Sequence, residues 1–76
     1  MNYRTGEVTE VSFADRTRRP GDEMDGYTIH KITFKVWGDS PFLLFWEQVG
    51  EELHSRRVVS ASEARWIDFA QAETQA

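Results

Sequence analysis

The chain has 76 residues, of which 13 are acidic and nine are basic, and its formal net charge is −4. This length allows one domain, which we expect to span residues 1–76. The absence of cysteine excludes disulfides, a thiol nucleophile and cysteine-ligated zinc. A domain this small buries only about 60% of the surface of its unfolded chain, so its core must draw on the three Trp, two Tyr and five Phe.

The first predicted strand covers residues 6–14, where Val8, Val11 and Phe13 stand among other residues that favour strands. Val8 falls on the even-numbered face of this strand, whereas Val11 and Phe13 fall on the odd-numbered face. A β-bulge near residues 9–10 would bring all three side chains to the same side of a sheet.

A charged loop is predicted over residues 15–26, which contain two glycines and one proline. The second predicted strand follows at residues 27–37 and also changes face along its length. Tyr27 and Ile29 share its odd-numbered face, whereas the apolar residues of its second half share the even-numbered face: Ile32, Phe34 and Val36. Two long strands that each change face indicate a strongly curved sheet.

Residues 38–41 predict a turn, and residues 42–46 are five consecutive large apolar residues. A helix would spread these five side chains around its whole circumference, which a tiny domain cannot cover. We therefore predict a short strand over residues 42–46. The alternative is a helix capped by Ser40 that begins at Pro41.

A short helix is predicted next, over residues 47–55, with Val49 and Leu53 directed inward. The end of the chain supports two interpretations after a strand over residues 57–61. Residues 60–63 match a capping box and could start a helix. Alternatively, residues 65–71 form a final strand, with Ile67 and Phe69 directed inward.

These elements together predict a small, β-dominated α+β domain. Its expected architecture is a strongly curved antiparallel sheet, similar to an OB fold or a small barrel, with one short helix at residues 47–55. The alternative fold is a two-stranded hairpin packed on two helices.

No residue pattern in the chain supports catalysis, metal binding or a cofactor. His30 and His54 are far apart in the sequence and have no nucleophile in a recognisable motif beside them. The sequence has no metal-ligand spacing and no glycine-rich phosphate loop. We therefore expect a protein that is not an enzyme, with no catalytic residue, no metal site and no cofactor.

The location of the protein is predicted from what the sequence lacks. The region after Met1 has no apolar leader, and the longest apolar run is too short to span a membrane. Together with the missing cysteines, these features lead us to expect a cytoplasmic protein that does not contact membranes.

Two groups of residues are candidates for binding a partner. The first is aromatic and apolar, which is typical of protein interfaces: Trp37, Phe42, Leu44 and Trp46. The second is basic and would suit single-stranded nucleic acid: Arg16, Arg18, Arg19, Lys31 and Lys35. The net negative charge disfavours nucleic acid, so we expect a protein partner, and a homodimer is compatible with the same features.

Two resemblances bear on function. Residues 42–53 resemble a stretch of bacterial single-stranded-DNA-binding proteins of the OB fold, in which a strand ending in an aromatic residue runs into a helix with Glu and Leu. These proteins are usually longer than this chain. As a compact, acidic, cysteine-free domain without a catalytic signature, the chain also resembles by type the anti-CRISPR proteins and other small inhibitors of phages and mobile elements.

The resemblance by type implies a protein-binding module that inhibits a nucleic-acid-handling complex. The resemblance to OB-fold proteins implies the alternative, a binder of single-stranded nucleic acid.

Overall fold

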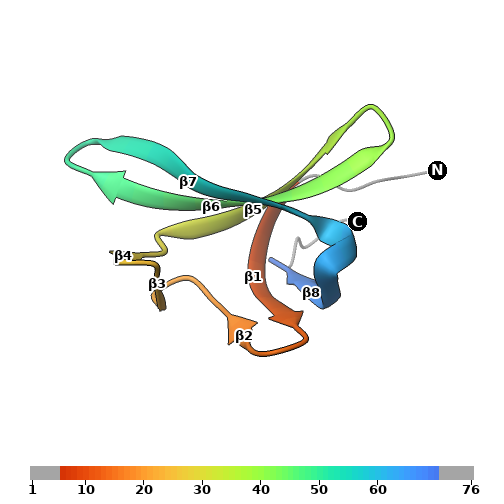
Figure 1. Cartoon of the computed structure of the whole chain (residues 1–76). Coiled ribbons are helices and arrows are strands. Elements are labelled where there is room, and N and C mark those ends of the chain that lie inside the picture. The colour runs from red at the N-terminus through yellow and green to blue at the C-terminus, as the bar shows by residue number, and fades with distance from the viewer. Residues whose placement is uncertain (1–5, 71–76) are drawn as a thin grey trace.

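The computed structural model describes residues 6–70, and nearly all of its regular structure is antiparallel β-sheet (Figure 1). The elements follow in chain order: β1 Gly6–Phe13, β2 Thr17–Arg18, β3 Glu23–Met24, β4 Tyr27–Thr28, β5 Lys31–Trp37, β6 Ser40–Val49, β7 Glu52–Ser60, the 3₁₀ turn η1 Ala61–Glu63, and β8 Ala64–Phe69. The β-dominated fold predicted from the sequence is confirmed. The α+β class is wrong, because residues 6–70 contain no α-helix.

The main sheet has the order β2-β1-β5-β6-β7, and β8 also pairs with β1. Strands β5, β6 and β7 form an upper layer in Figure 1, whereas β1, β8 and the short strands lie beneath it. Among residues 6–70, β7 pairs with β6 and β8 pairs with β1, but β7 and β8 do not pair with each other. The sheet is therefore open and does not close into the barrel that we expected.

Two tight hairpins hold the upper layer together. Trp37 pairs with Ser40 across one turn, and Val49 pairs with Glu52 across the other. Each turn has two residues and begins with a glycine, whose φ angle is 62° in the first turn and 63° in the second. Left-handed backbone at the first turn position is characteristic of type II′ turns, whose twist matches that of the flanking strands.

The second of these hairpins replaces the predicted helix at residues 47–55. Strand β6 continues to Val49, the chain turns at residues 50–51, and β7 returns from Glu52. A glycine inside a helix costs about 1 kcal/mol relative to alanine, whereas Gly50 supplies the positive φ angle that the turn requires. The alternative fold with two helices is wrong, because residues 6–70 contain no α-helix.

The changes of face predicted in the first two strands are confirmed. In the pairing of β1 with β8, the register shifts between Val8 and Glu10, and both Val8 and Val11 are fully buried. In the second predicted strand, a break at residues 29–30 separates β4 from β5, so that Ile29 and Ile32 are both buried.

The end of the chain follows the strand interpretation. Ser60 caps a short 3₁₀ turn by accepting a hydrogen bond from the main-chain N–H of Ser62. Strand β8 begins directly afterwards, with Ile67 and Phe69 packed against the core as expected. The predicted extension of this strand to Gln71 lies outside the described residues.

The hydrophobic core lies between the upper layer and the elements beneath it. Its buried members come from both layers: Val8, Val11, Met24, Tyr27, Ile29, Ile32, Phe34, Leu43 and Phe45. Strand β8 closes one side, where the rings of Phe34 and Phe69 meet edge to face at 5.3 Å. Such aromatic pairs contribute about 0.5–1.5 kcal/mol beyond the area that they bury.

Among residues 6–70, the hydroxyl of Tyr27 is the one buried side-chain oxygen or nitrogen that lacks a hydrogen-bond partner. The side chain is 7% exposed, and its hydroxyl is buried without a hydrogen bond. Burial raises the pKa of Tyr27, and the carboxylate of Asp25 raises this pKa further. The fold therefore favours the neutral phenol over the phenolate.

We predict that Tyr27→Phe is neutral or stabilising at neutral pH, by up to about 1 kcal/mol, because it removes a buried hydroxyl without a partner. The phenol is neutral in both states below the unfolded pKa of about 10. As the pH rises through the higher folded pKa, the unfolded state ionises more readily and the wild-type protein loses stability. Urea unfolding from about pH 9 to 11 should therefore show a smaller loss of stability in Tyr27→Phe. Equal losses in the two proteins would contradict this assignment.

Candidate binding face on the upper layer

Strand register places the predicted aromatic residues together on one side of the upper layer. Within β6, Leu43 and Phe45 point into the core, so the alternating residues point to the opposite side. That side includes Phe42, Leu44 and Trp46. Their neighbours on β5 are, in the same order, Lys35, Thr33 and Lys31.

We call this surface the open face and define it by its residues on β5, β6 and β7. It comprises Lys31, Thr33, Lys35, Trp37, Phe42, Leu44, Trp46, Leu53 and Val58. Val58 lies opposite Leu44, and Leu53 lies opposite Gln48, which shares the face of Trp46. The predicted site residues Trp37, Phe42, Leu44 and Trp46 are therefore brought together by the fold.

No described element lies over the open face (Figure 1). Trp37 is 51% exposed, Val58 is 49% exposed, and Phe42 and Trp46 are half-buried. Leu44 is only 6% exposed, although it does not belong to the core cluster. Leu44 is therefore buried on the side of the layer that points away from the core.

Two contacts hold the aromatic rings of the open face in place. The indole N–H of Trp46 donates a hydrogen bond of 2.9 Å to the Oγ1 of Thr33 on the next strand. The rings of Trp37 and Phe42 lie 5.0 Å apart with an interplanar angle of 46°. Side chains fixed before binding lose less conformational entropy when a partner arrives.

The open face carries positive charge although the whole chain is acidic. Lys31 and Lys35 lie on β5 beside Trp46 and Phe42, and neither makes an ion pair with the described residues. Glu7 on β1 lies opposite Thr33, at the margin of this face. The net charge of −4 therefore does not describe the local charge of this surface.

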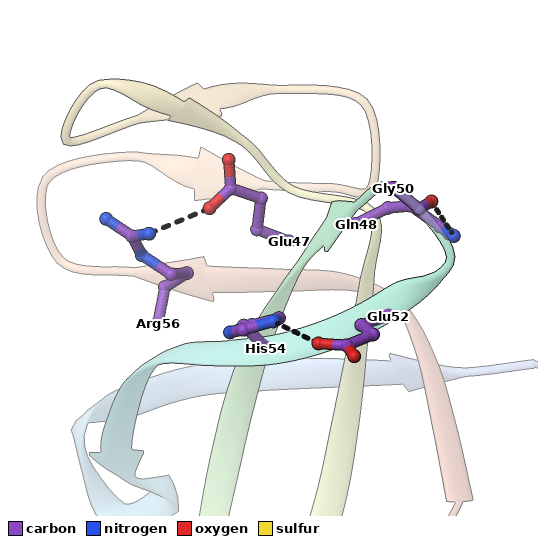
Figure 2. A network of polar contacts seen from close by, with 6 residues as sticks. All are labelled: Glu47, Gln48, Gly50, Glu52, His54 and Arg56. Carbon is purple, nitrogen blue, oxygen red and sulfur yellow. Dashed lines mark hydrogen bonds and ion pairs between the residues drawn. The ribbon is translucent and has the colours of Figure 1, made fainter.

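The β6–β7 hairpin carries two ion pairs (Figure 2), and they lie on the side of the layer opposite the open face. Arg56 Nη1 donates a 2.8 Å hydrogen bond to Glu47 Oε1, and His54 Nε2 lies 3.1 Å from Glu52 Oε1. Glu47 alternates with Phe45 and Leu43 along β6 and thus lies on the core side of the layer. These charged side chains therefore do not lie among the apolar residues of the open face.

A β-bulge in β7 directs two arginines toward the β3–β4 turn. The register shifts between Phe45 and Trp46, and the extra residue on β7 is Arg56. The guanidinium of Arg56 lies 5.2 Å from the centre of the Tyr27 ring. The next residue, Arg57, donates a hydrogen bond of 2.8 Å to Asp25. The bulge thus joins the upper layer to the small hairpin beneath it.

The three loop arginines predicted with the lysines do not join the open face. Arg16 and Arg18 line a pocket on the core side, described below. Arg19 lies 3.4 Å from Glu10 of β1. The structure thus separates the five predicted basic residues into two lysines on the open face and three arginines on the layer beneath.

Sequence reasoning missed Leu53 and Val58 as members of the open face. Leu53 was assigned to the inner side of a helix that does not exist. A hairpin predicted at Gly50 would have put both residues on the open face, because the register of such a hairpin sets which residues of β7 lie opposite those of β6.

Within residues 6–70, no three potential metal ligands of His, Asp or Glu gather into one group. No helix among these residues is long and apolar enough to cross a membrane. Comparisons with protein-family models, with curated proteins and with solved structures give no match.

We predict that Trp46 and Thr33 are energetically coupled. A double-mutant cycle of Trp46→Phe and Thr33→Val should give a coupling energy of about 0.5–1.5 kcal/mol in urea unfolding, the usual net contribution of a hydrogen bond. Lys35→Ala, on the same strand but without a contact to the indole N–H, is the control partner for Trp46→Phe. A coupling energy near zero for the Thr33 pair would show that the indole does not depend on this bond.

Proposed function

We propose that the chain is a non-enzymatic protein-binding module and that the open face is its contact surface. The observation that carries the proposal is the exposed Trp37, held against Phe42 on a sheet face that no described element covers. Tryptophan is enriched among the few residues that supply most of the binding energy of protein interfaces. Leu44 with Val58 opposite it, and then Trp46, continue the apolar area along β6 away from the turn.

The charges of the open face suggest the chemistry of the partner. Lys31 and Lys35 flank the apolar area along β5, and both are free of ion pairs with the described residues. A complementary protein surface would carry an apolar centre with carboxylates beside it, since matched charges fix orientation and speed association.

The type resemblance extends this proposal to a biological role. A compact acidic domain with one prepared contact face suits an inhibitor of a nucleic-acid-handling complex, of the kind carried by phages and mobile elements. Such an inhibitor would act in the cytoplasm by occupying an acidic and apolar surface of that complex. A second copy of the chain is another candidate occupant of the face.

One observation favours a second candidate, the binding of single-stranded nucleic acid. Lys31 lies beside Trp46 and Lys35 lies beside Phe42, and lysine is normally depleted at the centre of protein interfaces. Aromatic rings with adjacent cations are the usual means of stacking bases while holding phosphates. The three loop arginines would not take part, because Arg16 and Arg18 line the pocket on the core side and Arg19 lies beside Glu10 of β1.

We predict that Trp37→Ala weakens partner binding by about 2 kcal/mol or more, roughly 30-fold, as interface hot spots do. Trp66→Ala is the matched control, because Trp66 is 47% exposed but lies on β8. Proteins captured from a lysate after nuclease treatment should be lost with Trp37→Ala and kept with Trp66→Ala. Their affinities are then measured by calorimetry with the purified partner. Equal losses of binding in both variants would contradict the proposal that the open face is the contact surface.

The second candidate is tested with single-stranded oligothymidylate in a fluorescence-anisotropy titration. For a protein-binding module we expect no binding that depends on the two lysines. Binding that falls steeply from about 50 to 200 mM salt, and that disappears in the Lys31→Glu, Lys35→Glu double variant, would replace the first proposal with the second. Both lysine side chains point away from the core, so the double variant should remain folded.

A further inference from the structure

A pocket of about 330 Å³ opens on the core side of the sheet, away from the open face. Its walls come from the β1–β2 turn, β2, the β3–β4 turn, β7 and η1. A volume near 300 Å³ is at the lower end of the range for small-ligand sites. Segments that are far apart in the sequence thus converge on one concave surface.

The floor of the pocket is apolar and belongs to the core. Phe13 and Phe45 lie at its base with their ring centres 6.4 Å apart. Met24 and Val59 complete it, and Met24 is only 6% exposed. Methionine adapts its shape readily and packs well against aromatic rings. This floor therefore suits one aliphatic or aromatic group.

The rim carries charged groups of both signs, most of them already engaged. Asp25 accepts a hydrogen bond from Arg57 at 2.8 Å. Asp15 lies 3.7 Å from Arg16. The pocket lining thus contains two arginine–aspartate pairs, and within each pair the opposite charges offset each other.

Arg18 and Glu63 are the remaining charged groups of the rim. Arg18 donates a 3.2 Å hydrogen bond to the main-chain oxygen of Glu23, which is a neutral acceptor. Neither Arg18 nor Glu63 makes an ion pair with the described residues. The rim therefore offers one uncompensated guanidinium and one uncompensated carboxylate.

We propose that this pocket binds the carboxy-terminal apolar residue of a polypeptide. The terminal carboxylate would pair with Arg18, because guanidinium groups bind carboxylates through two parallel hydrogen bonds. The last amide N–H would donate to Glu63, and the apolar side chain would rest on the floor formed by Phe13, Met24 and Phe45. This proposal does not depend on the function proposed for the open face.

The proposal is tested with small probes that contain parts of such a terminus. N-acetyl-phenylalanine has the carboxylate, the amide N–H and an aromatic side chain. Its carboxamide lacks the negative charge, and 3-phenylpropionate lacks the amide. We expect N-acetyl-phenylalanine to shift the amide resonances around Met24 and Val59 in ¹H–¹⁵N spectra, and to bind at least about tenfold more tightly than its carboxamide. Weaker binding of 3-phenylpropionate than of N-acetyl-phenylalanine would favour a polypeptide terminus over a simple organic acid.

Two variants address the pocket from different sides. Arg18→Gln should weaken N-acetyl-phenylalanine about tenfold or more, because a charged hydrogen bond is lost. Val59→Phe should block the floor while leaving the rim charges in place. Lys35→Gln, on the open face, is the matched control for the charge change and should leave the affinity unchanged.

Two results would overturn the proposal. One is equal binding of the acid and the carboxamide, and the other is a set of shifted resonances on the open face instead of the pocket. Where Arg18→Gln reduces folding, measured by thermal unfolding, Val59→Phe still decides the question. Failure of these titrations leaves the Trp37 experiment unaffected, because the two surfaces lie on opposite sides of β6.

Discussion

The structure depends on one constraint: within residues 6–70, the other elements cover only one side of the β5–β6–β7 layer. Every other described element packs beneath this layer, and the core cluster lies between them. A domain of this size has a thin core and no disulfide to support it. Among the described residues, no further element lies on the second side of the layer. Leu44 on this side is almost fully buried although it does not belong to the core cluster. On the same side, a hydrogen bond to Thr33 holds the indole of Trp46.

Irregularities in the strands make the covered side possible. The register shift at Thr9 brings Val8 and Val11 to the same side, and the break at residues 29–30 does the same for Ile29 and Ile32. These shifts could be predicted from the sequence, because a strand that changes its apolar face must contain an extra residue or a break. The β7 bulge at Arg56 could not, since nearly all of β7 is exposed and has no apolar alternation to interrupt. Residues 47–55 were predicted as a helix with Val49 and Leu53 directed inward, whereas Gly50 was the better guide, because its positive φ angle suits a hairpin turn.

The two predicted groups of site residues also differ in whether the sequence pattern alone could place them. Trp37, Phe42, Leu44 and Trp46 share a face because the two-residue turn after Trp37 fixes the register of β5 against β6. This grouping follows from local geometry and was therefore accessible from the sequence. The positions of Arg16, Arg18 and Arg19 depend instead on how residues 14–26 fold back onto β1 and β7. Tertiary contacts such as the bond between Arg57 and Asp25 accompany this path, and nothing in the loop sequence indicates them.

The distribution of charge also explains why the net charge of the chain does not describe the charge of the open face. The acidic residues that make the net charge negative include Glu47, Glu52 and Asp25. Their carboxylates contact Arg56, His54 and Arg57, respectively. Lys31 and Lys35 are not neutralised in this way, so the surface beside Trp46 and Phe42 is locally basic. Screening confines such surface charges to a range of about 8 Å at physiological ionic strength, so a partner on the open face meets the two lysines before it meets the rest of the chain. Because the pocket near Arg18 lies on the other side of the layer, its charges act on a different approach path. Each surface therefore has its own electrostatic environment, set by local pairing rather than by the sum over the chain.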